Sequence, residues 1–282
     1  MTRIQESRVA RTGPFFTVFV LAASAMAWLV SGCGSSGEVV NFGAEEHFRL
    51  GKQKFDDGDY LEAIAEFQLV KLQFPGSTVA DDAQFYMGES HFDRGEYLLA
   101  VEDYRTLKRN MASSPLVPMA QFKTAMSYYM LSPRTELDQT YTRQAIDEFQ
   151  AFVEYYPLDE HRAGAEDKIR ELNGRLAEKL FETAEQYVKL GYHRSAGVYF
   201  DFVIQKYHDT PYAEQAHLGK INTLISRKRT GEAREEIDRF LEKYPDSTLL
   251  REVIDLRNQI GAGADSASAA AGPASTAGKV KQ

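Results

Sequence analysis

The chain has 282 residues, with 41 acidic and 33 basic side chains and a formal net charge of −8 at pH 7. This acidic balance argues against nucleic-acid binding, which needs a basic patch, and against a surface that seeks anionic lipid headgroups. The single cysteine excludes a disulfide framework and a zinc site built from thiolates. Stability must therefore come from packing, for which 17 phenylalanines and 15 tyrosines supply buriable area.

The N-terminal segment has the parts of a secretory signal peptide. Three arginines precede an uncharged apolar run of 16 residues, 15–30, and the small pair Ser31 and Gly32 follows it. A membrane-spanning helix needs about 20 apolar residues, so this run is short for a permanent anchor. Cys33 comes directly after the small pair. The segment therefore resembles a bacterial lipoprotein signal, in which an aliphatic residue and two small residues precede an invariant cysteine.

The resemblance to a lipoprotein signal makes Cys33 the expected lipid-attachment residue. It implies a diacylglycerol on the Cys33 sulfur, removal of residues 1–32 as the signal peptide, and an N-acyl chain on the new N-terminus. Several acyl chains hold a protein firmly in a membrane, whereas one chain binds only marginally. Gly34, where other lipoproteins have aspartate, resembles the lipoproteins that are passed on to the outer membrane. Removing residues 1–32 deletes three arginines and one glutamate, so the mature net charge would be −10.

Two other interpretations of Cys33 are open. The segment could be an ordinary signal peptide with an incidental cysteine. A catalytic thiol would need a neighbouring base, and no histidine or carboxylate lies within four residues of Cys33 in the sequence.

Composition divides the mature chain into three parts. Residues 33–43 read as the lipidated cysteine and a short linker of small and polar residues. Residues 44–260 carry the periodic apolar pattern and are expected to hold the structure. Ala, Gly and Ser make up 15 of the 22 residues at 261–282, which predicts a disordered tail.

A repeated pattern anchored on alanine runs through residues 44–260. The stretches "GDYLEAIAEF" (58–67) and "GEYLLAVEDY" (95–104) share it. Apolar residues recur four, seven and eleven positions after each anchor, which marks one face of an α-helix, and a proline follows three of them. The anchors are Ala63, Ala100, Ala145, Ala196 and Ala233. The closing prolines are Pro75, Pro157 and Pro245.

Small residues before three of the five anchors complete the pattern. Gly51, Gly88 and Ala184 lie twelve positions earlier, where a preceding helix can approach closely. A glycine five positions before the anchor, as at Gly58 and Gly95, suits a left-handed turn between two helices. These features are typical of tetratricopeptide repeats. The sequence thus predicts an all-α, right-handed superhelix of about five such repeats.

The anchor spacings are 37, 45, 51 and 37 residues, and the two middle ones exceed the usual repeat length of about 34 by the most. The extra residues of the third repeat fall at 131–140, "LSPRTELDQT", which predicts a loop between its two helices. From about residue 161 to 190 there is no proline, and apolar residues keep helical spacing. This stretch predicts one long helix that leads into the fourth repeat.

The first helices of such repeats line an extended concave surface. The predicted groove residues are Phe48, Lys52 and Phe55 in the first repeat, Phe85, Glu89 and Phe92 in the second, Phe122 and Tyr129 in the third, and Phe181 and Glu185 in the fourth. The recurring phenylalanines could receive aromatic and aliphatic side chains of an extended peptide. The alternative is that these rings pack against neighbouring helices.

The sequence gives no support for catalysis or for a metal site. Zinc-protease, hydrolase and phosphate-loop motifs are absent, and the six histidines are scattered. The acidic stretch "DDGD" (56–59) lacks the ligand spacing of a calcium loop and reads as a turn. We therefore predict a protein that is not an enzyme and has no metal or cofactor apart from the lipid.

A lipobox followed by these repeats, with "EFQAFVEYYP" (148–157) and "FLEKYPDS" (240–247), resembles the BamD/YfiO family of outer-membrane protein assembly lipoproteins. The resemblance implies a scaffold on the periplasmic face of the outer membrane, held by its lipid anchor. It implies binding to the periplasmic domains of a BamA-like barrel protein through the C-terminal repeats. It also implies contact with other assembly lipoproteins and, through the N-terminal repeats, with the C-termini of unfolded barrel proteins. Nucleic acid is not an expected partner.

Departures from the family pattern leave two alternative functions open. His208 replaces the closing proline of the fourth repeat, and Ile237 replaces an aromatic residue in the fifth. One rival is a periplasmic tetratricopeptide adaptor that links cell-wall synthesis or division to envelope constriction. The other is an envelope lipoprotein enzyme on a helical-repeat scaffold. Such an enzyme would need a second, catalytic domain, and residues 44–260 leave no room for one.

Overall fold

The computed structural model describes residues 42–270, with side chains to Gly261. Within this range the chain forms eleven helices and no strand. The helices are α2 (Ala44–Asp56), α3 (Tyr60–Gln73), α4 (Ala80–Asp93), α5 (Tyr97–Asn110), α6 (Val117–Leu131), α7 (Thr140–Tyr155), α8 (Arg162–Lys189), α9 (His193–Lys206), α10 (Tyr212–Ser226), α11 (Thr230–Lys243) and α12 (Leu250–Ala270). The predicted signal peptide, Cys33 and the end of the tail lie outside the described residues.

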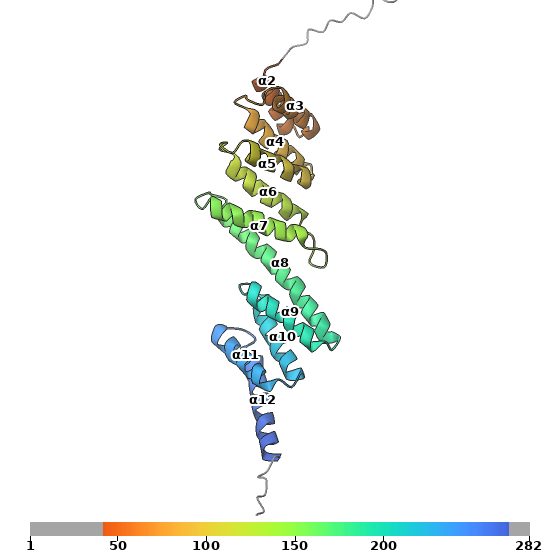
Figure 1. Cartoon of the computed structure of the whole chain (residues 1–282), viewed down its shortest axis with the longest axis vertical. Helices are drawn as coiled ribbons and strands as arrows, with labels where there is room; N and C mark the ends of the chain where they lie inside the picture. Colours follow the sequence, from red (N-terminus) through yellow and green to blue (C-terminus); the bar gives the residue numbers. More distant parts are fainter. Residues whose placement is uncertain (1–41, 271–282) are drawn as a thin grey trace, which may run out of the picture. The chain divides into compact units, whose positions relative to one another are not determined.

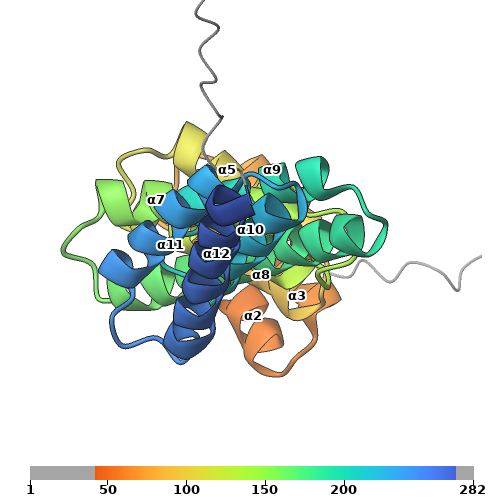
Figure 2. The same cartoon turned by 90° about the horizontal axis from the view of Figure 1, so that it is seen from below.

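The helices pair as five successive hairpins, α2/α3 to α10/α11, and α12 follows the last pair (Figure 1). Each helix packs against the next one in the chain, so every hairpin is stacked on its neighbours in sequence order. Figure 2 shows α12 beside α11, against which its apolar side packs. The predicted all-α fold of tetratricopeptide-type repeats is confirmed.

The predicted core positions are the core of each hairpin. All five anchor alanines, and all ten residues four and seven positions after them, are fully buried. The residue eleven positions after the anchor is the first one past the helix. Its N–H donates to the carbonyl of the residue four positions earlier, as in Phe74 to Val70 at 2.8 Å and Tyr244 to Phe240 at 2.9 Å. In three of the five hairpins a proline follows and cannot continue the helix, and the helix ends at the same position in the other two.

Glycine is required at two kinds of position. Gly58 has φ +84° in the turn between α2 and α3, where a side chain would be strained. At Gly51, an added Cβ would lie 2.6 Å from the Phe67 ring, so only glycine lets α2 approach α3. The acidic stretch 56–59 covers the end of α2 and this turn.

A polar pair recurs inside the hairpins and has no counterpart among the sequence-based predictions. In four of the five, a His or Gln on the first helix contacts an Asp or Glu three positions after the anchor alanine. The pairs are His47–Glu66 (2.7 Å), Gln84–Asp103 (3.0 Å), Gln121–Glu148 (2.9 Å) and His217–Glu236 (2.6 Å). Because both partners are at least partly buried, each pair ties the two helices of its hairpin at a fixed register.

Helix α8 is the predicted long helix and has 28 residues. Its first half places Leu172 and Leu176 in the core cluster of the third hairpin, and its second half places Ala177 and Ala184 in the cluster of the fourth. The predicted loop before α7 is also present, since α6 ends at Leu131 and α7 begins at Thr140.

The C-terminal segment differs from the predicted tail in one respect. Helix α12 continues to Ala270, so the first ten residues of segment 261–282 have helical backbone. Alanine has the highest helix propensity, and alanines are frequent in this stretch, which lets the helix extend past its last apolar contact. Residues 271–282 lie outside the described range.

Candidate functional site

The predicted groove residues lie on the first helices of the hairpins. Helix α2 carries Phe48, Lys52 and Phe55, helix α4 carries Phe85, Glu89 and Phe92, helix α6 carries Phe122 and Tyr129, and helix α8 carries Phe181 and Glu185. Their contacts divide them into two sets. One set packs inward against the hairpin core, and the other lies farther out along the helices.

The recurring phenylalanines belong to the inward set. Each packs against the core ring four positions after the anchor alanine of its own hairpin, and the same geometry repeats along the chain. The ring-centroid distances are 5.8 Å for Phe48–Phe67, 5.7 Å for Phe85–Tyr104, 5.8 Å for Phe122–Phe149 and 5.7 Å for Phe181–Phe200. Phe85 is only 8% exposed. These contacts favour the packing alternative for this row.

Phe55 and Phe92 lie farther out and remain partly exposed. Each meets an aromatic ring at the start of the following helix edge-on, Tyr60 at 5.6 Å and Tyr97 at 5.3 Å. Both rings therefore have a fixed orientation and an accessible side. This combination suits contact with the side chains of a bound segment.

Lysine ammonium groups lie over these rings. Lys52 Nζ is 5.5 Å from the centre of the Phe55 ring and 5.1 Å from that of Tyr86. Lys123 Nζ, on α6, is 5.1 Å from the centre of the Phe92 ring. At these distances the ammonium is attracted to the ring face. We call these two groups together, Lys52 with Phe55 and Tyr86 and Lys123 with Phe92, the aromatic–lysine strip.

The lysine charges in the strip are locally compensated. Lys52 pairs with Asp56 on the same helix. Lys123 Nζ lies 2.6 Å from Glu89 Oε2, and the Tyr104 hydroxyl donates to the other Glu89 oxygen at 2.5 Å. Burial and the Glu89 carboxylate raise the pKa of the Tyr104 hydroxyl, so it stays protonated and donates. The strip therefore presents aromatic faces with little net charge.

A related arrangement occurs one hairpin further along. Lys168 Nζ of α8 lies 4.1 Å from the centre of the Tyr129 ring and 3.1 Å from Glu171 Oε2. The Tyr129 hydroxyl donates to the other Glu171 oxygen at 2.8 Å. Lysine, aromatic ring and carboxylate thus recur together on the first helices.

The sequence-based reasoning missed Tyr86 and Lys123. Tyr86 contacts the rings of Phe48, Phe55 and Phe85 and joins the first two hairpins. Neither residue follows the alanine-anchored spacing, so the repeat pattern contains no signal for them. Only the stacking of one hairpin on the next brings them to the strip.

The described residues contain no group of three or more His, Cys, Asp or Glu side chains placed to hold a metal ion. In the same part of the chain, none of the helices combines the length and apolar character that a membrane span requires.

Comparison with known proteins gives a family match. The model of the family YfiO, described as an outer membrane lipoprotein, matches residues 42–217. No curated protein matches the chain. The matched range covers the first four hairpins and ends inside α10, before the fifth hairpin is complete.

Solved structures that resemble the chain include tetratricopeptide proteins. TTC0263, a tetratricopeptide protein of Thermus thermophilus, is 18% identical with a TM-score of 0.33, and the match covers 78% of this chain and 98% of that one. The TPR2AB domain of yeast Sti1 is 13% identical with a TM-score of 0.38, covering 77% and 98%. The TPR domain of P58(IPK) is 16% identical with a TM-score of 0.39, covering 77% and 58%.

Proposed function

Because the chain belongs to the YfiO family of outer membrane lipoproteins, we propose that it is a non-catalytic scaffold of the machinery that assembles β-barrel proteins in the outer membrane. In this role it binds the periplasmic domains of a BamA-like barrel subunit, other assembly lipoproteins, and the C-termini of unfolded barrel proteins. Diacylglycerol and an N-acyl chain on Cys33 hold it at the periplasmic face of the membrane.

The observation that carries the client-binding part of the proposal is the aromatic–lysine strip, whose rings lie on the first two hairpins and whose Lys123 comes from the third. Its rings are partly exposed and held in place by neighbouring rings, so little side-chain entropy is lost when they contact a ligand. Its lysines are already paired, which favours an apolar or aromatic segment over a strongly charged one. A barrel-protein C-terminus that ends in an aromatic residue has this chemistry.

Affinity purification tests the scaffold role. The full-length protein, tagged at its C-terminus, is purified from detergent-solubilised outer membrane, and co-purifying proteins are identified by mass spectrometry. A large barrel protein with repeated periplasmic domains is expected. Recovery only of cell-wall synthases or division proteins would overturn barrel assembly and favour the adaptor role. A Cys33→Ser variant serves as control, because it keeps the repeats and loses the site of acylation.

Lipidation at Cys33 gives a direct prediction. The N-terminal peptide of the mature protein is expected to begin at Cys33 and to carry the mass of diacylglycerol and an amide-linked acyl chain. Mass spectrometry of the peptide from purified outer membrane makes the measurement. A mature N-terminus at any other residue, or an unmodified Cys33, would refute the lipoprotein assignment.

Replacing Phe92 by alanine is expected to weaken binding of a client peptide about tenfold, because an oriented aromatic contact at a binding surface is lost. The probe is a fluorescent peptide that copies the C-terminus of a barrel protein, and its dissociation constant is measured by anisotropy. Since Phe92 is only partly buried, the free energy of unfolding should fall by about 1 kcal/mol, and the fold should remain intact.

Phe202→Ala is the matched control for Phe92→Ala. Its ring is 44% exposed on α9, outside the strip, so this substitution should leave peptide binding unchanged. If the wild type and Phe92→Ala bound the client peptide with equal affinity, the aromatic–lysine strip would have no part in client recognition.

A further inference from the structure

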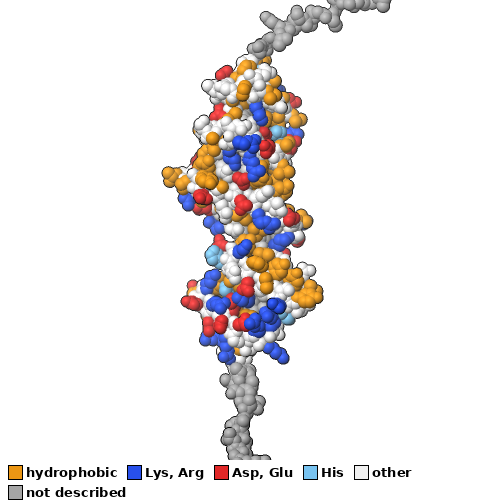
Figure 3. All heavy atoms as spheres, viewed as in Figure 1, with side chains coloured by type: hydrophobic (Ala, Val, Ile, Leu, Met, Phe, Trp, Pro, Cys, Tyr) orange, Lys and Arg blue, Asp and Glu red, His pale blue; other side chains and the backbone are white. Residues whose placement is uncertain are grey.

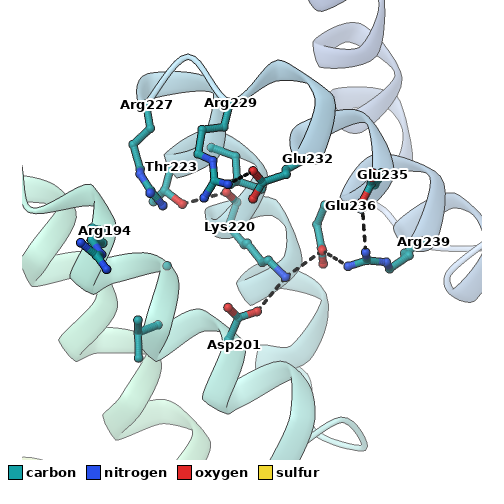
Figure 4. Close-up of a pocket in the computed structure, with 13 residues that line it drawn as sticks. Arg194, Asp201, Lys220, Thr223, Arg227, Arg229, Glu232, Glu235, Glu236 and Arg239 are labelled. Carbon is teal, nitrogen blue, oxygen red and sulfur yellow. Dashed lines mark hydrogen bonds and ion pairs between the residues drawn. The ribbon is translucent and has the colours of Figure 1, made fainter.

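A cavity of about 370 Å³ opens between α9, α10 and α11 (Figure 4). Its lining is rich in charged side chains of both signs. The basic ones are Arg194, Lys220, Arg227, Arg229 and Arg239, and the acidic ones are Asp201, Glu232, Glu235 and Glu236. In the space-filling view, Lys and Arg side chains gather in the region of α10 and α11 (Figure 3). This basic concentration occurs on a chain whose net charge is negative.

All four acidic side chains of the cavity are paired within it. Lys220 Nζ lies 2.7 Å from Asp201 Oδ1 and 2.8 Å from Glu236 Oε2. Arg239 contacts Glu236 at 2.7 Å and Glu235 at 3.5 Å. Arg229 forms an ion pair with Glu232. Three cations thus share four carboxylates, so this network carries one excess negative charge.

Arg194 and Arg227 are the two basic residues of the lining that take no part in these ion pairs. Among the described residues, neither guanidinium has an ion-pair or hydrogen-bond partner, and Figure 4 shows both on the side of the cavity away from Glu235 and Arg239. Arg194 comes from α9, and Arg227 follows the end of α10. The cavity therefore holds two guanidinium groups outside the ion-paired network, and its five basic and four acidic side chains give the lining a net charge of +1.

The turn that carries Arg227 is strained. Lys228 has φ +59°, whereas the corresponding turns of three other hairpins have glycine with positive φ. A non-glycine residue in this conformation carries a conformational cost. The turn places Arg227 and Arg229, the two residues that flank Lys228, at the cavity. The residues from Lys220 onward also lie beyond residue 217, where the family match ends, so the match does not account for this site.

The apolar part of the lining restricts the class of ligand that the cavity can bind. Val198 is 50% exposed and lies one helical turn from Arg194, and Leu224 lines the cavity from α10. A guanidinium binds a carboxylate through two parallel hydrogen bonds. A phosphate carries more negative charge than a carboxylate. The four acidic side chains of the lining would therefore repel a phosphate more strongly than a carboxylate. The lining thus fits one carboxylate next to an apolar side chain.

We propose that this cavity binds an acidic side chain of a protein partner, with its carboxylate on Arg194 and Arg227 and an adjacent apolar side chain on Val198. The inference rests on the proposed scaffold role in one respect, which is that the protein must have a protein partner. It does not depend on which machinery supplies that partner.

Site-specific photocrosslinking in cells tests the proposal. Benzoylphenylalanine replaces Val198 in the full-length chain, and mass spectrometry maps the partner segment joined to it after irradiation. The expected segment contains Asp or Glu within a few residues of the crosslink. The double substitution Arg194→Glu and Arg227→Glu should lower the crosslink yield about tenfold, because hydrogen-bonded charges are then replaced by like charges. Changing the partner's acidic residue to lysine should restore the yield in that background.

Arg134→Glu with Arg251→Glu is the matched control, since it makes the same change in net charge at exposed arginines outside the cavity. Its crosslink yield should equal that of the wild type, and circular dichroism should show equal helicity for all variants. Crosslinks to lipid alone, no protein crosslink, or a yield unaffected by the Arg194 and Arg227 substitutions would each overturn the proposal. The identity of the crosslinked protein tests the proposed function separately, because any acidic partner segment supports the cavity assignment.

Discussion

Replacing Gly88 by leucine is expected to lower the free energy of unfolding by about 3 kcal/mol, the upper end of the usual cost of overpacking. A Cβ added at Gly88 would lie 2.6 Å and 2.9 Å from two carbons of the Tyr104 ring. That ring cannot move aside, because it is fully buried and its hydroxyl is held by Glu89. Either α4 moves away from α5 or the ring leaves its position, and both disrupt the second hairpin. Urea unfolding followed by circular dichroism measures the change.

Gly174→Leu is the matched control for Gly88→Leu. Gly174 also lies within a helix, but a Cβ added there would meet no atom within 4 Å. Leucine has a higher helix propensity than glycine, so this substitution should raise stability by about 0.5 to 1 kcal/mol. If both variants were as stable as the wild type, close approach of α4 and α5 would not be what requires glycine at position 88.

Replacing Glu236 by alanine is expected to cost about 3 kcal/mol, as is common when one partner of a buried charge cluster is removed. Glu236 is 1% exposed, and its carboxylate has three partners. His217 Nδ1 lies 2.6 Å away, Lys220 Nζ 2.8 Å and an Arg239 nitrogen 2.7 Å. Without the carboxylate, His217 and Lys220 lose the group that compensates their burial. Glu235→Ala, at a neighbouring exposed position with one ion pair at 3.5 Å, should change stability by less than about 0.5 kcal/mol.

The contribution of Glu236 to the free energy of unfolding should also depend on pH. Burial alone would raise the pKa of this carboxyl, but hydrogen bonds from His217 and Lys220 outweigh it and lower the pKa from 4.5 to about 2. A depressed pKa means that the folded state favours the charged form. The stabilisation is therefore fully present above about pH 5 and is lost as the pH falls through 4.5 toward 2.

The comparison of Glu236→Ala with the wild type over this pH range makes the measurement. The difference in unfolding free energy should be largest above about pH 5 and should shrink as the pH falls below the unfolded-state pKa. A difference that is the same at pH 3 and pH 7 would contradict the ionised state assigned to Glu236.

The helices and the core of this protein were predictable from the sequence because their causes are local. Spacings of four and seven residues after an anchor alanine define a helix face, and a proline after the aromatic residue ends the helix. The same local reasoning predicted the left-handed turn at Gly58, the loop before α7 and the long helix α8. Helix α12 extends farther than predicted because alanine-rich sequence is compatible with both helix and disorder.

The candidate sites were less predictable because contacts between hairpins decide them. A phenylalanine such as Phe85 has the same helical spacing whether it faces a groove or a core ring, and only the neighbouring Tyr104 decides for packing. Lys123 reaches the Phe92 ring from another hairpin, 31 positions later in the chain. No spacing rule within one helix relates such residues.

The sequence by itself determined the helical repeats, their boundaries and the positions where glycine or alanine must stand, because hydrogen bonding, sterics and apolar periodicity act over a few residues. Which charges are compensated was decided only by the tertiary structure. Glu236 is paired from α10 and from its own helix, whereas Arg194 and Arg227 are left without a partner among the described residues. Burial and charge pairing depend on side chains brought together from different helices, so they arise only when the hairpins stack.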